Sequence, residues 1–573
     1  MSRQKLDLDV AARQAFGVTY DRPKNLQELV GLVKAGTLRM PPQPDWSGNI
    51  LDWNSDPFGD RNWQFQFHTL RWINPLRWAA LEGDPEAKKL WKAVVKSWFE
   101  SNVPASRATA PFAWKDMADG NRALQMALGA PLIDEEDTWY WDSLQAHVDW
   151  LMDDKNIVRG NHALHQNAGL IVAGAVLGNE DALTTAQERL SKQFLLAFDA
   201  QGTNEEGSTA YHAHNLSWWT QIWHRLELEG VQPPEDVRGT LENAVDVLAH
   251  LSQPDGYLPR IGDSGLMRVR RDLGASTDFL ESSGETGTPP PGRSVNLERG
   301  YLISRSGWGE TRPLSLESHS ILRYGAPPHS HAHNDRGSLH VYAVGRPWLV
   351  DSGFHSYQRK DPVVDYLYSR DAHNVASLRG LKHDKRADVR LTRANITDLY
   401  DDFIVQDDGF HGRLLQRRTI YLREPDVWLI WDTVSGASSE DLQQFWHIDS
   451  GVRVYRRDRG FELRGGLSSV VLTWLGAQPS LKLAKADKTS LVGWIATRWK
   501  TLVPGSIAIA TTKASNARGL TLLISPASAP ENQIGVVGSY ITTSGMLDLK
   551  LAGRGQQWHI RVNEESVSVS SNS

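Results

Sequence analysis

The stretch ALHQNAGLIVAGAVLG, residues 163–178, determines how the first half of the chain folds. Its apolar residues recur at helical spacing, and the same spacing returns in TTAQERLSKQFLLAF, residues 184–198. Short turns that contain Gly, Pro or Asp separate segments of this kind. Because the pattern extends from about residue 25 to about residue 270, the sequence predicts a helical array for this half.

The pattern changes after Tyr301. Short runs such as LHVYAVG (339–345), VWLIWDTV (427–434) and LTLLIS (520–525) are rich in Val, Ile, Leu and aromatic residues and are separated by turns. Such runs predict β-strands, which we expect to form an antiparallel β-sandwich. A series of helices followed by a series of strands indicates two packed domains rather than an interleaved α/β fold.

A polar segment lies between the two patterns. Residues 272–297 include STDFLESSGETGTPPPGRS and are rich in Ser, Thr, Gly and Pro, with too few apolar residues for a packed element. We therefore predict a helical domain over 1–271, a linker over 272–297 and a β-sandwich domain over 298–573.

Composition limits the classes of function. The chain of 573 residues has a net charge of −6, which gives no overall attraction to nucleic acid or to an anionic membrane, so we expect neither as a partner. The absence of cysteine excludes disulfides and thiolate metal sites. The start, MSRQKLDLDVAARQ, carries charges where a signal peptide has an apolar core. We expect a cytoplasmic protein, or a periplasmic or secreted one if a leader has been removed, as a monomer or homodimer.

The densest group of chemically active side chains is histidine-rich. His329, His331 and His333 occupy alternate positions, so in an extended segment they share one face. With Asp351 and His373 downstream, they favour a functional site over isolated core histidines. His333, Asp351 and His373 form a donor set suited to Zn²⁺. The alternative is that Asp351 and His373 only bind each other or nearby backbone, and the sequence leaves both interpretations open.

The helical half carries a second group. Asn161 and His162 follow a glycine at the expected start of a helix, where side chains and free backbone N–H groups can face an anion. Tyr211 and His212 lie in EEGSTAYHAHN, after a glycine-containing turn. Helix capping by Asn161 and Ser208 is the alternative, and it does not account for Tyr211 and His212.

These motifs occur together and in a fixed order: Asn161-His162, Glu206-x-Ser208-x-x-Tyr211-His212, PDGYLPRIGDSG with Gly262 and Asp263, His331-x-His333-x-Asp335, GRPWLVDSG with Asp351, and His373-Asn374. In this order the chain resembles the heparinase II/III-like polysaccharide lyases, a group that also includes alginate and other polyuronate lyases. The resemblance covers nearly the whole chain. It implies an incomplete (α/α) toroid followed by an antiparallel β-sandwich, and cleavage of a uronic-acid-containing polysaccharide by β-elimination.

The resemblance also implies roles for single residues. Tyr211 would be the catalytic acid and a candidate base, and three residues would surround the substrate carboxylate, namely Asn161, His162 and His331. The positions of metal ligands, for a structural ion that is most simply zinc, are matched by His333, Asp351 and His373. Further candidate substrate contacts are His212, Trp114, Arg122, Arg336 and Arg370. The chain departs from the family pattern in TRWK (497–500), where Trp499 stands in place of an expected tyrosine.

Chemistry explains why these residue types are needed. The C5 proton of a uronate is barely acidic while the adjacent carboxylate keeps its charge, so donors such as Asn161 and His331 must neutralise that charge. The base is either Tyr211, if nearby cations lower its pKa, or His162. One alternative is a glycoside hydrolase that uses two carboxylates. Another is a non-catalytic glycan-binding or assembly protein that uses a tryptophan-rich cleft without turnover, since the chain has 23 tryptophans. As substrate, a bacterial capsular polysaccharide or exopolysaccharide is our expectation.

Overall fold

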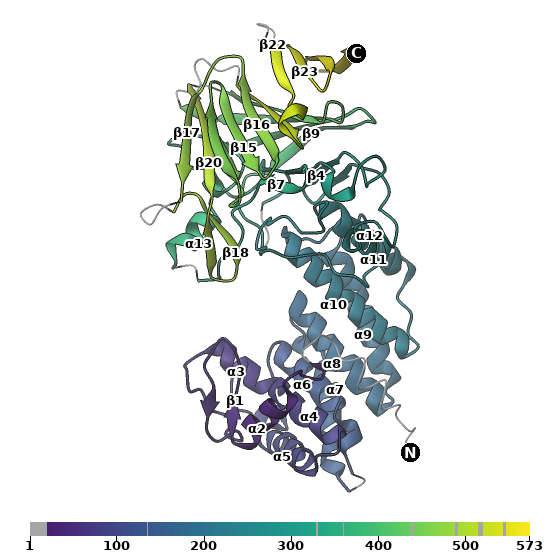
Figure 1. The fold of residues 1–573 in the computed structure, drawn as a ribbon. Coiled ribbons are helices and arrows are strands. Elements are labelled where there is room, and N and C mark those ends of the chain that lie inside the picture. The colour runs from purple at the N-terminus through teal and green to yellow at the C-terminus, as the bar shows by residue number, and fades with distance from the viewer. Residues whose placement is uncertain are drawn as a thin grey trace. The chain divides into compact units, whose positions relative to one another are not determined.

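The computed structural model describes residues 20–134, 136–327, 330–358, 360–436, 440–486, 491–513, 519–541 and 546–572. His329, the first of the three alternating histidines, lies outside the described residues. The chain forms two compact units (Figure 1). The first comprises Met1–Ala197 with Ser217–Gly239, and the second comprises Phe198–Leu216 with Thr240–Ser573.

The first unit is helical, as the periodicity predicts. Apart from a small hairpin of strands β1 (Thr37–Leu38) and β2 (Trp46–Ser47), its main elements are the helices α2 (Leu26–Lys34), α3 (Arg61–His68), α4 (Asn74–Leu81), α5 (Pro85–Asn102), α6 (Met117–Ala127), α7 (Thr138–Met152), α8 (Asn161–Leu177) and α9 (Glu180–Ala197). Two further helices, α10 (Thr209–Leu228) and α11 (Glu235–Leu251), each have residues in both units.

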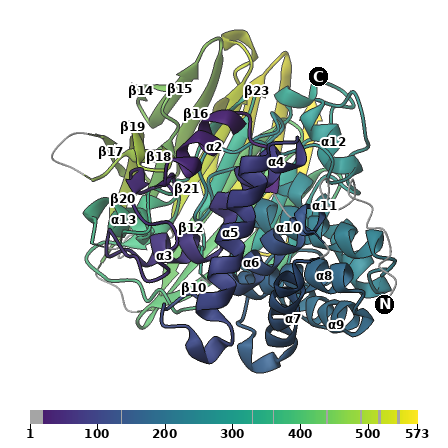
Figure 2. The same cartoon turned by 90° about the horizontal axis from the view of Figure 1, so that it is seen from below.

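Helices α6 and α8 pack side by side (Figure 2). Glycine makes this close approach feasible, because a Cβ atom on Gly120 would lie 2.4 Å from Cα of Gln166, and one on Gly169 would lie 2.2 Å from the carbonyl oxygen of Gly120. Helix α8 ends where Gly178 adopts a left-handed conformation, the usual way to stop a helix. Residues 163–178 therefore form a buried helix and its end, with glycine at the contact with α6 and at the C-terminal end.

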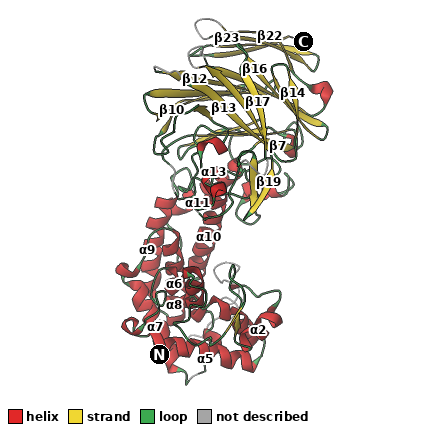
Figure 3. Ribbon diagram, turned by 90° about the vertical axis from the view of Figure 1, so that its left-hand side faces the viewer, coloured by secondary structure: helices red, strands yellow, loops and turns green. Residues whose placement is uncertain are grey.

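The second unit holds two large antiparallel sheets, drawn as yellow strands in Figure 3. The nine-stranded sheet comprises β3 (Val295–Leu297), β4 (Tyr301–Arg305), β5 (His319–Arg323), β6 (Leu339–Ala343), β7 (Arg346–Leu349), β8 (Ala376–Leu378), β13 (Asp441–Ile448), β17 (Ser480–Lys485) and β20 (Ser506–Lys513). The eight-stranded sheet comprises β9 (Val389–Ile396), β10 (Tyr400–Phe410), β11 (Arg413–Leu422), β12 (Val427–Ser435), β14 (Arg453–Arg457), β15 (Gly460–Gly465), β16 (Ser468–Leu475) and β21 (Leu520–Ala527).

The core between these sheets confirms the predicted sandwich. Trp348 and Trp446 from the nine-stranded sheet join Trp428 and Trp474 from the eight-stranded sheet in one apolar cluster, each with no exposed surface. A four-stranded sheet packs on the outer side through a second apolar cluster and comprises β22 (Gly535–Ile541), β23 (Leu547–Gly553), β24 (Gln556–Val562) and β25 (Val567–Asn572). A separate hairpin comprises β18 (Trp494–Arg498) and β19 (Thr501–Pro504), and a short helix is α13 (Pro362–Leu367).

The predicted linker, residues 272–297, differs from what the composition suggests. It contains helix α12 (Ala275–Glu281), where Leu280 is buried, and strand β3, which pairs with β4. Side-chain hydrogen bonds compensate for the low apolar content, since Ser276 donates to Asp246 at 2.7 Å. The boundary between the units is also not a single position in the sequence, because Phe198–Leu216 belongs to the second unit and Ser217–Gly239 to the first.

The described part of the chain contains no helix long and apolar enough to cross a membrane.

Candidate active site

Tyr211 and His331 lie face to face at the centre of the candidate site. Tyr211 is in the first turn of α10, in the part of that helix that belongs to the second unit. Its ring stacks on His331 with 3.4 Å between ring centroids and 9° between ring planes. Nε2 of His331 lies 3.9 Å from a carboxylate oxygen of Glu206. The two aromatic rings therefore form one rigid surface that presents a hydroxyl group and an imidazole nitrogen together.

Local backbone geometry brings His331 to this position. The amide of Asp263 donates to the carbonyl of His331 at 2.8 Å. Gly262, at φ +65°, permits this contact, because a Cβ atom there would lie 2.6 Å from the same carbonyl oxygen. The glycine of the IGDSG motif is thus required by close backbone approach.

Asp263 links the two histidines that the sequence places on one face. Its Oδ2 accepts a hydrogen bond from Nδ1 of His331 at 2.9 Å, and its Oδ1 accepts one from Nε2 of His333 at 2.9 Å and one from the hydroxyl of Tyr368 at 2.5 Å. Burial alone would raise the pKa of Asp263, but the hydrogen bonds from His331 and His333 outweigh it and hold the pKa below its usual value. Asp263 is therefore a charged, buried anchor for both imidazoles.

A second tyrosine, which the sequence interpretation missed, meets Tyr211. The hydroxyl oxygens of Tyr211 and Tyr357 are 2.5 Å apart. Burial raises the pKa of Tyr211, the hydrogen bond from Tyr357 lowers it, and the net shift is upward. The pKa of Tyr357 is also raised, chiefly by burial. Both hydroxyls are therefore protonated near neutral pH, and the structure does not show the lowered pKa that a tyrosine base requires.

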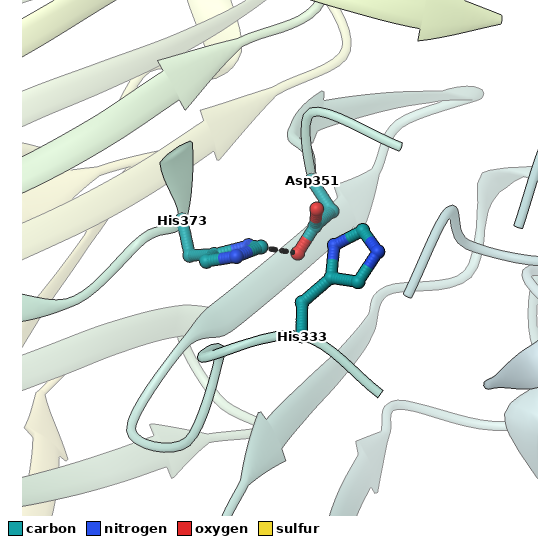
Figure 4. A group of neighbouring side chains, drawn as sticks. All are labelled: His333, Asp351 and His373. Atoms are coloured by element: carbon teal, nitrogen blue, oxygen red, sulfur yellow. Dashed lines mark hydrogen bonds and ion pairs between the residues drawn. The ribbon is translucent and has the colours of Figure 1, made fainter. Parts of the chain in front are cut away.

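The predicted metal ligands come together in the second unit, in connecting segments between strands. His333, Asp351 and His373 each offer one ligand atom, and these atoms lie within 4.8 Å of one another (Figure 4). All three side chains are buried. Nδ1 of His373 bonds to Asp351 at 2.8 Å, as the simpler of the two sequence interpretations expects.

The remaining ring nitrogens decide whether a metal fits. Nε2 of His373 and Nδ1 of His333 are buried and have no hydrogen-bond partner among the described residues. Unpaired nitrogens of this kind are costly unless something binds them. Burial would raise the pKa of Asp351, but the charge of His373 outweighs it and the pKa is lowered, so the carboxylate is ionised. Two imidazole nitrogens and a carboxylate fit a zinc-type ion.

Asn161 and His162 belong to the first unit, at the start of α8. Nδ1 of His162 bonds to Oδ1 of Asp116 at 2.5 Å, and the imidazole remains half exposed. Asp116 has a φ of +63°, a strained value for a residue with a side chain. The structure thus gives His162 a carboxylate partner that the sequence interpretation did not identify.

Two family models match this chain in succession. The model described as Heparinase II/III N-terminus matches residues 39–281, and the model described as Heparinase II/III-like, C-terminal matches residues 302–510. The chain belongs to the heparinase II/III-like family. The predicted family is thereby confirmed, and the matches span both the helical and the β-sandwich parts of this family member.

Curated relatives of this family member are distant. It is 20% identical over 449 residues to a heparin-sulfate lyase of Bacteroides thetaiotaomicron, an alignment covering 70% of this chain and 63% of the relative. It is 21% identical over 444 residues to a heparin-sulfate lyase of Pedobacter heparinus, covering 70% of this chain and 64% of the relative. The chain therefore spans slightly less than two thirds of these relatives.

Solved structures confirm the fold of this family member. Heparan sulfate lyase HepC from Pedobacter heparinus has a TM-score of 0.76 at 16% identity, covering 94% of this chain and 89% of that one. A heparinase III structure has a TM-score of 0.69 at 16% identity, covering 98% and 90%. The predicted combination of helical toroid and antiparallel sandwich is thus confirmed.

Three arginines predicted to bind substrate are buried in this family member. Arg122 has no exposed surface and donates to Nε2 of His147 at 2.8 Å and to backbone carbonyls. Arg336 donates to the carbonyls of Lys385 and Ala387. Arg370 pairs with Asp407 at 2.7 Å and donates to backbone carbonyls. These contacts hold the guanidinium groups against neighbouring loops and helices, and the role of the three arginines in substrate binding stays a prediction.

The remaining two predicted substrate contacts differ from each other. His212 is buried, its Nε2 bonds to the carbonyl of Ala244 at 3.0 Å, and burial lowers its pKa to about 4, so it is a neutral structural residue. Trp114 is only half buried and its indole N–H donates to the carbonyl of Asn102 at 2.7 Å. Trp114 alone of the five keeps an exposed surface, and its contact with substrate stays a prediction.

Proposed function

We propose that this protein is a polysaccharide lyase that cleaves a uronic-acid-containing polysaccharide by β-elimination and leaves unsaturated uronate ends. One observation carries the proposal. Tyr211 and His331 form a stacked pair in which His331 is fixed by a buried carboxylate and the hydroxyl of Tyr211 is held by Tyr357. The family membership and the names of the curated relatives, both heparin-sulfate lyases, support the same reaction.

His331 is suited to binding the substrate carboxylate. Asp263 holds Nδ1, so Nε2, which lies 3.9 Å from a carboxylate oxygen of Glu206, is the ring nitrogen that can bind substrate. A donor at Nε2 stabilises the charge that develops on the carboxylate when the C5 proton leaves, and one preorganised donor of this type is typically worth about 3 to 4 kcal/mol. The hydrogen bond to the buried carboxylate of Asp263 fixes the orientation of this imidazole.

Tyr211 is suited to protonating the leaving oxygen. Its raised pKa keeps the hydroxyl protonated near neutral pH, and this proton can pass to O4 as the C4–O4 bond breaks. The 2.5 Å contact with Tyr357 gives the resulting phenolate a hydrogen-bond donor. The candidate bases for the C5 proton are His162 and Tyr211, and Tyr211 could act so only if substrate binding lowers its pKa, which burial raises in the structure.

We further propose that His333, Asp351 and His373 hold one divalent ion, most simply zinc, with a structural role. Such an ion would pin together the connecting segments that carry its ligands. The bond from Nε2 of His333 to Asp263 would then transmit this rigidity to His331. The role of His333 is therefore to keep Asp263, and through Asp263 also His331, in one orientation.

The substrate is proposed at two levels. An acidic, uronate-containing glycan follows from the need for a carboxylate at C5 of the cleaved residue. Heparan-type glycosaminoglycan is the first candidate, because both curated relatives are named for it, and a bacterial capsular polysaccharide or exopolysaccharide is the second.

A hydrolase is less well supported by the geometry. A retaining or inverting hydrolase needs a pair of carboxyl groups facing the scissile bond. Asp263 already accepts three hydrogen bonds through its two oxygens, and Asp119 is a buried carboxyl that binds Trp150 and Gln166.

A product analysis tests the proposal. The purified protein is incubated with heparan sulfate, alginate, polyglucuronate and capsular polysaccharides, and ultraviolet absorbance and product masses are recorded. Elimination gives an absorbing product whose mass contains no added water, and Tyr211→Phe should form it at least about a hundredfold more slowly. Products that contain one added water and do not absorb would establish hydrolysis and refute the proposal, as would full activity in Tyr211→Phe.

A further inference from the structure

An exposed aromatic cluster adjoins the hydroxyl pair of the candidate site. Phe354, Tyr357 and Trp499 contact one another, with ring centroids 4.7 Å apart for Phe354 and Tyr357, and 5.7 Å apart for both contacts of Trp499. Trp499 is 52% exposed and Tyr357 is 47% exposed. Leaving such large apolar surfaces in water is unfavourable, and a contiguous exposed cluster of this kind is typical of a binding surface.

The exposure of Trp499 is not shared by the tryptophans of the sandwich. Trp348, Trp428, Trp446 and Trp474 are buried with no exposed surface. They fill the core, whereas Trp499 lies at the turn between β18 and β19. Core packing therefore explains the buried tryptophans of the sandwich, but it does not explain the exposed indole of Trp499.

The hairpin that carries Trp499 is held firmly. The amide of Ala496 donates to the carbonyl of Ser352 at 2.7 Å, and the amide of Lys500 donates to the carbonyl of His355 at 2.9 Å. Gly353, at φ +72°, permits the first contact, since a Cβ atom there would lie 2.3 Å from the carbonyl oxygen of Ala496. The segment that carries Tyr357 and the hairpin that carries Trp499 are thus joined, and the aromatic surface is preorganised for binding.

Charge identifies the kind of ligand. Arg498 and Lys500 flank Trp499 in sequence, and the side chains of both residues are exposed. A flat indole with a cation on each side suits a sugar ring that carries a carboxylate or sulfate. The position is next to the reacting groups, because Tyr357 bonds to Tyr211 at 2.5 Å.

We propose that Phe354, Tyr357 and Trp499, with Arg498 and Lys500, form a subsite that binds an acidic sugar residue adjacent to the one that is cleaved. Trp499 stacks on the face of that sugar, and the two cations bind its anionic groups. The inference rests on the proposed lyase function and deepens it. It assigns Arg498 and Lys500 the preference for an anionic over a neutral sugar residue next to the one that is cleaved.

The test compares Trp499→Ala and Trp499→Phe with a control, Tyr540→Ala, which removes an aromatic ring that is 66% exposed, against 52% for Trp499, from β22. Initial rates on the best substrate of the panel give kcat and KM. Loss of one aromatic anchor should raise KM by about tenfold in Trp499→Ala and less in Trp499→Phe, with kcat within about twofold and Tyr540→Ala unchanged. An unchanged KM in Trp499→Ala would overturn the subsite. In that case the activity of the wild type would still support the lyase function.

A binding measurement keeps the two proposals separable. Calorimetric titration of the same polysaccharide into Tyr211→Phe, and into Tyr211→Phe with Trp499→Ala, measures the subsite without turnover. We expect about tenfold weaker binding in the double variant, and a further salt-dependent loss when Arg498 and Lys500 are both replaced by Ala. Equal binding by Tyr211→Phe and the double variant would overturn the subsite even if the wild type proved to be inactive as a lyase.

Discussion

Asp263→Asn tests the central arrangement of the site most sharply. The substitution preserves shape but replaces one carboxylate oxygen with an NH₂ group. Three donors point at this side chain, from His331, His333 and Tyr368. The amide oxygen can face His333 and Tyr368, in which case the NH₂ group faces Nδ1 of His331. The N–H at Nδ1 of His331 then faces another donor and loses its acceptor, unless the imidazole turns or changes tautomer.

The expected magnitude follows from these contacts. A buried donor left without a partner costs about 1 to 3 kcal/mol, and each 1.4 kcal/mol corresponds to about a tenfold change in rate. We therefore expect kcat/KM on an acidic polysaccharide to fall by about ten- to a hundredfold. The assay is the initial rate of ultraviolet absorbance increase, with thermal unfolding measured on the same samples.

A second buried carboxylate supplies the control. Asp402 lies in β10 and binds Arg418 at 2.7 Å and 2.8 Å. Asp402→Asn should lower the unfolding temperature while the folded protein keeps its kcat/KM. The reasoning would be refuted if Asp263→Asn kept kcat/KM within twofold of wild type, or if Asp402→Asn lost as much activity as Asp263→Asn.

Three further predictions concern single groups. Tyr211→Phe retains the ring stacked on His331 and removes the proton donor. We therefore expect kcat to fall by at least about a hundredfold while KM changes little. A kcat near the wild-type value would contradict the acid role. Elemental analysis should find one divalent ion per chain in the wild type and none in His373→Ala. The unfolding temperature of His373→Ala should no longer respond to a chelator. A wild type that is purified without metal and is unaffected by added zinc would contradict the metal site. Arg370 holds the pKa of Asp407 well below its usual value against the effect of burial, so this carboxylate contributes stability above about pH 4 and loses it as the pH falls through the folded pKa. The difference in unfolding temperature between wild type and Asp407→Asn should therefore shrink as the pH is lowered from about 6 towards 3, and a constant difference would contradict the assignment.

Much of the fold follows from local pattern. The helical spacing of residues 163–178 predicts the helix that the structure shows as α8, and the alternating runs predict strands such as β12 and β21. The polar segment 272–297 shows the limit of this reasoning, because hydrogen bonds of Ser276 and burial of Leu280 form a helix where composition predicts a linker. Average composition records neither kind of contact.

The types of residue in the site were readable from the sequence, and their partners were not. The alternation of His331 and His333 places both imidazoles on one face, and the structure shows both bound to Asp263. The pairing of Tyr211 with Tyr357 joins residues 146 positions apart, and no periodicity signals it. The burial of Arg122 likewise depends on neighbours contributed by other helices.

Residue patterns alone thus indicate the class of each half, the family motifs and the donor set His333, Asp351 and His373. Only the packing of distant segments shows which ring nitrogens lack a hydrogen-bond partner among the described residues, which tyrosine contacts Tyr211, and that the hairpin bearing Trp499 lies beside them. The physical reason is that periodicity reports which side of an element is buried. Hydrogen bonds and pKa shifts depend on the distance between groups that only the packing of distant segments sets.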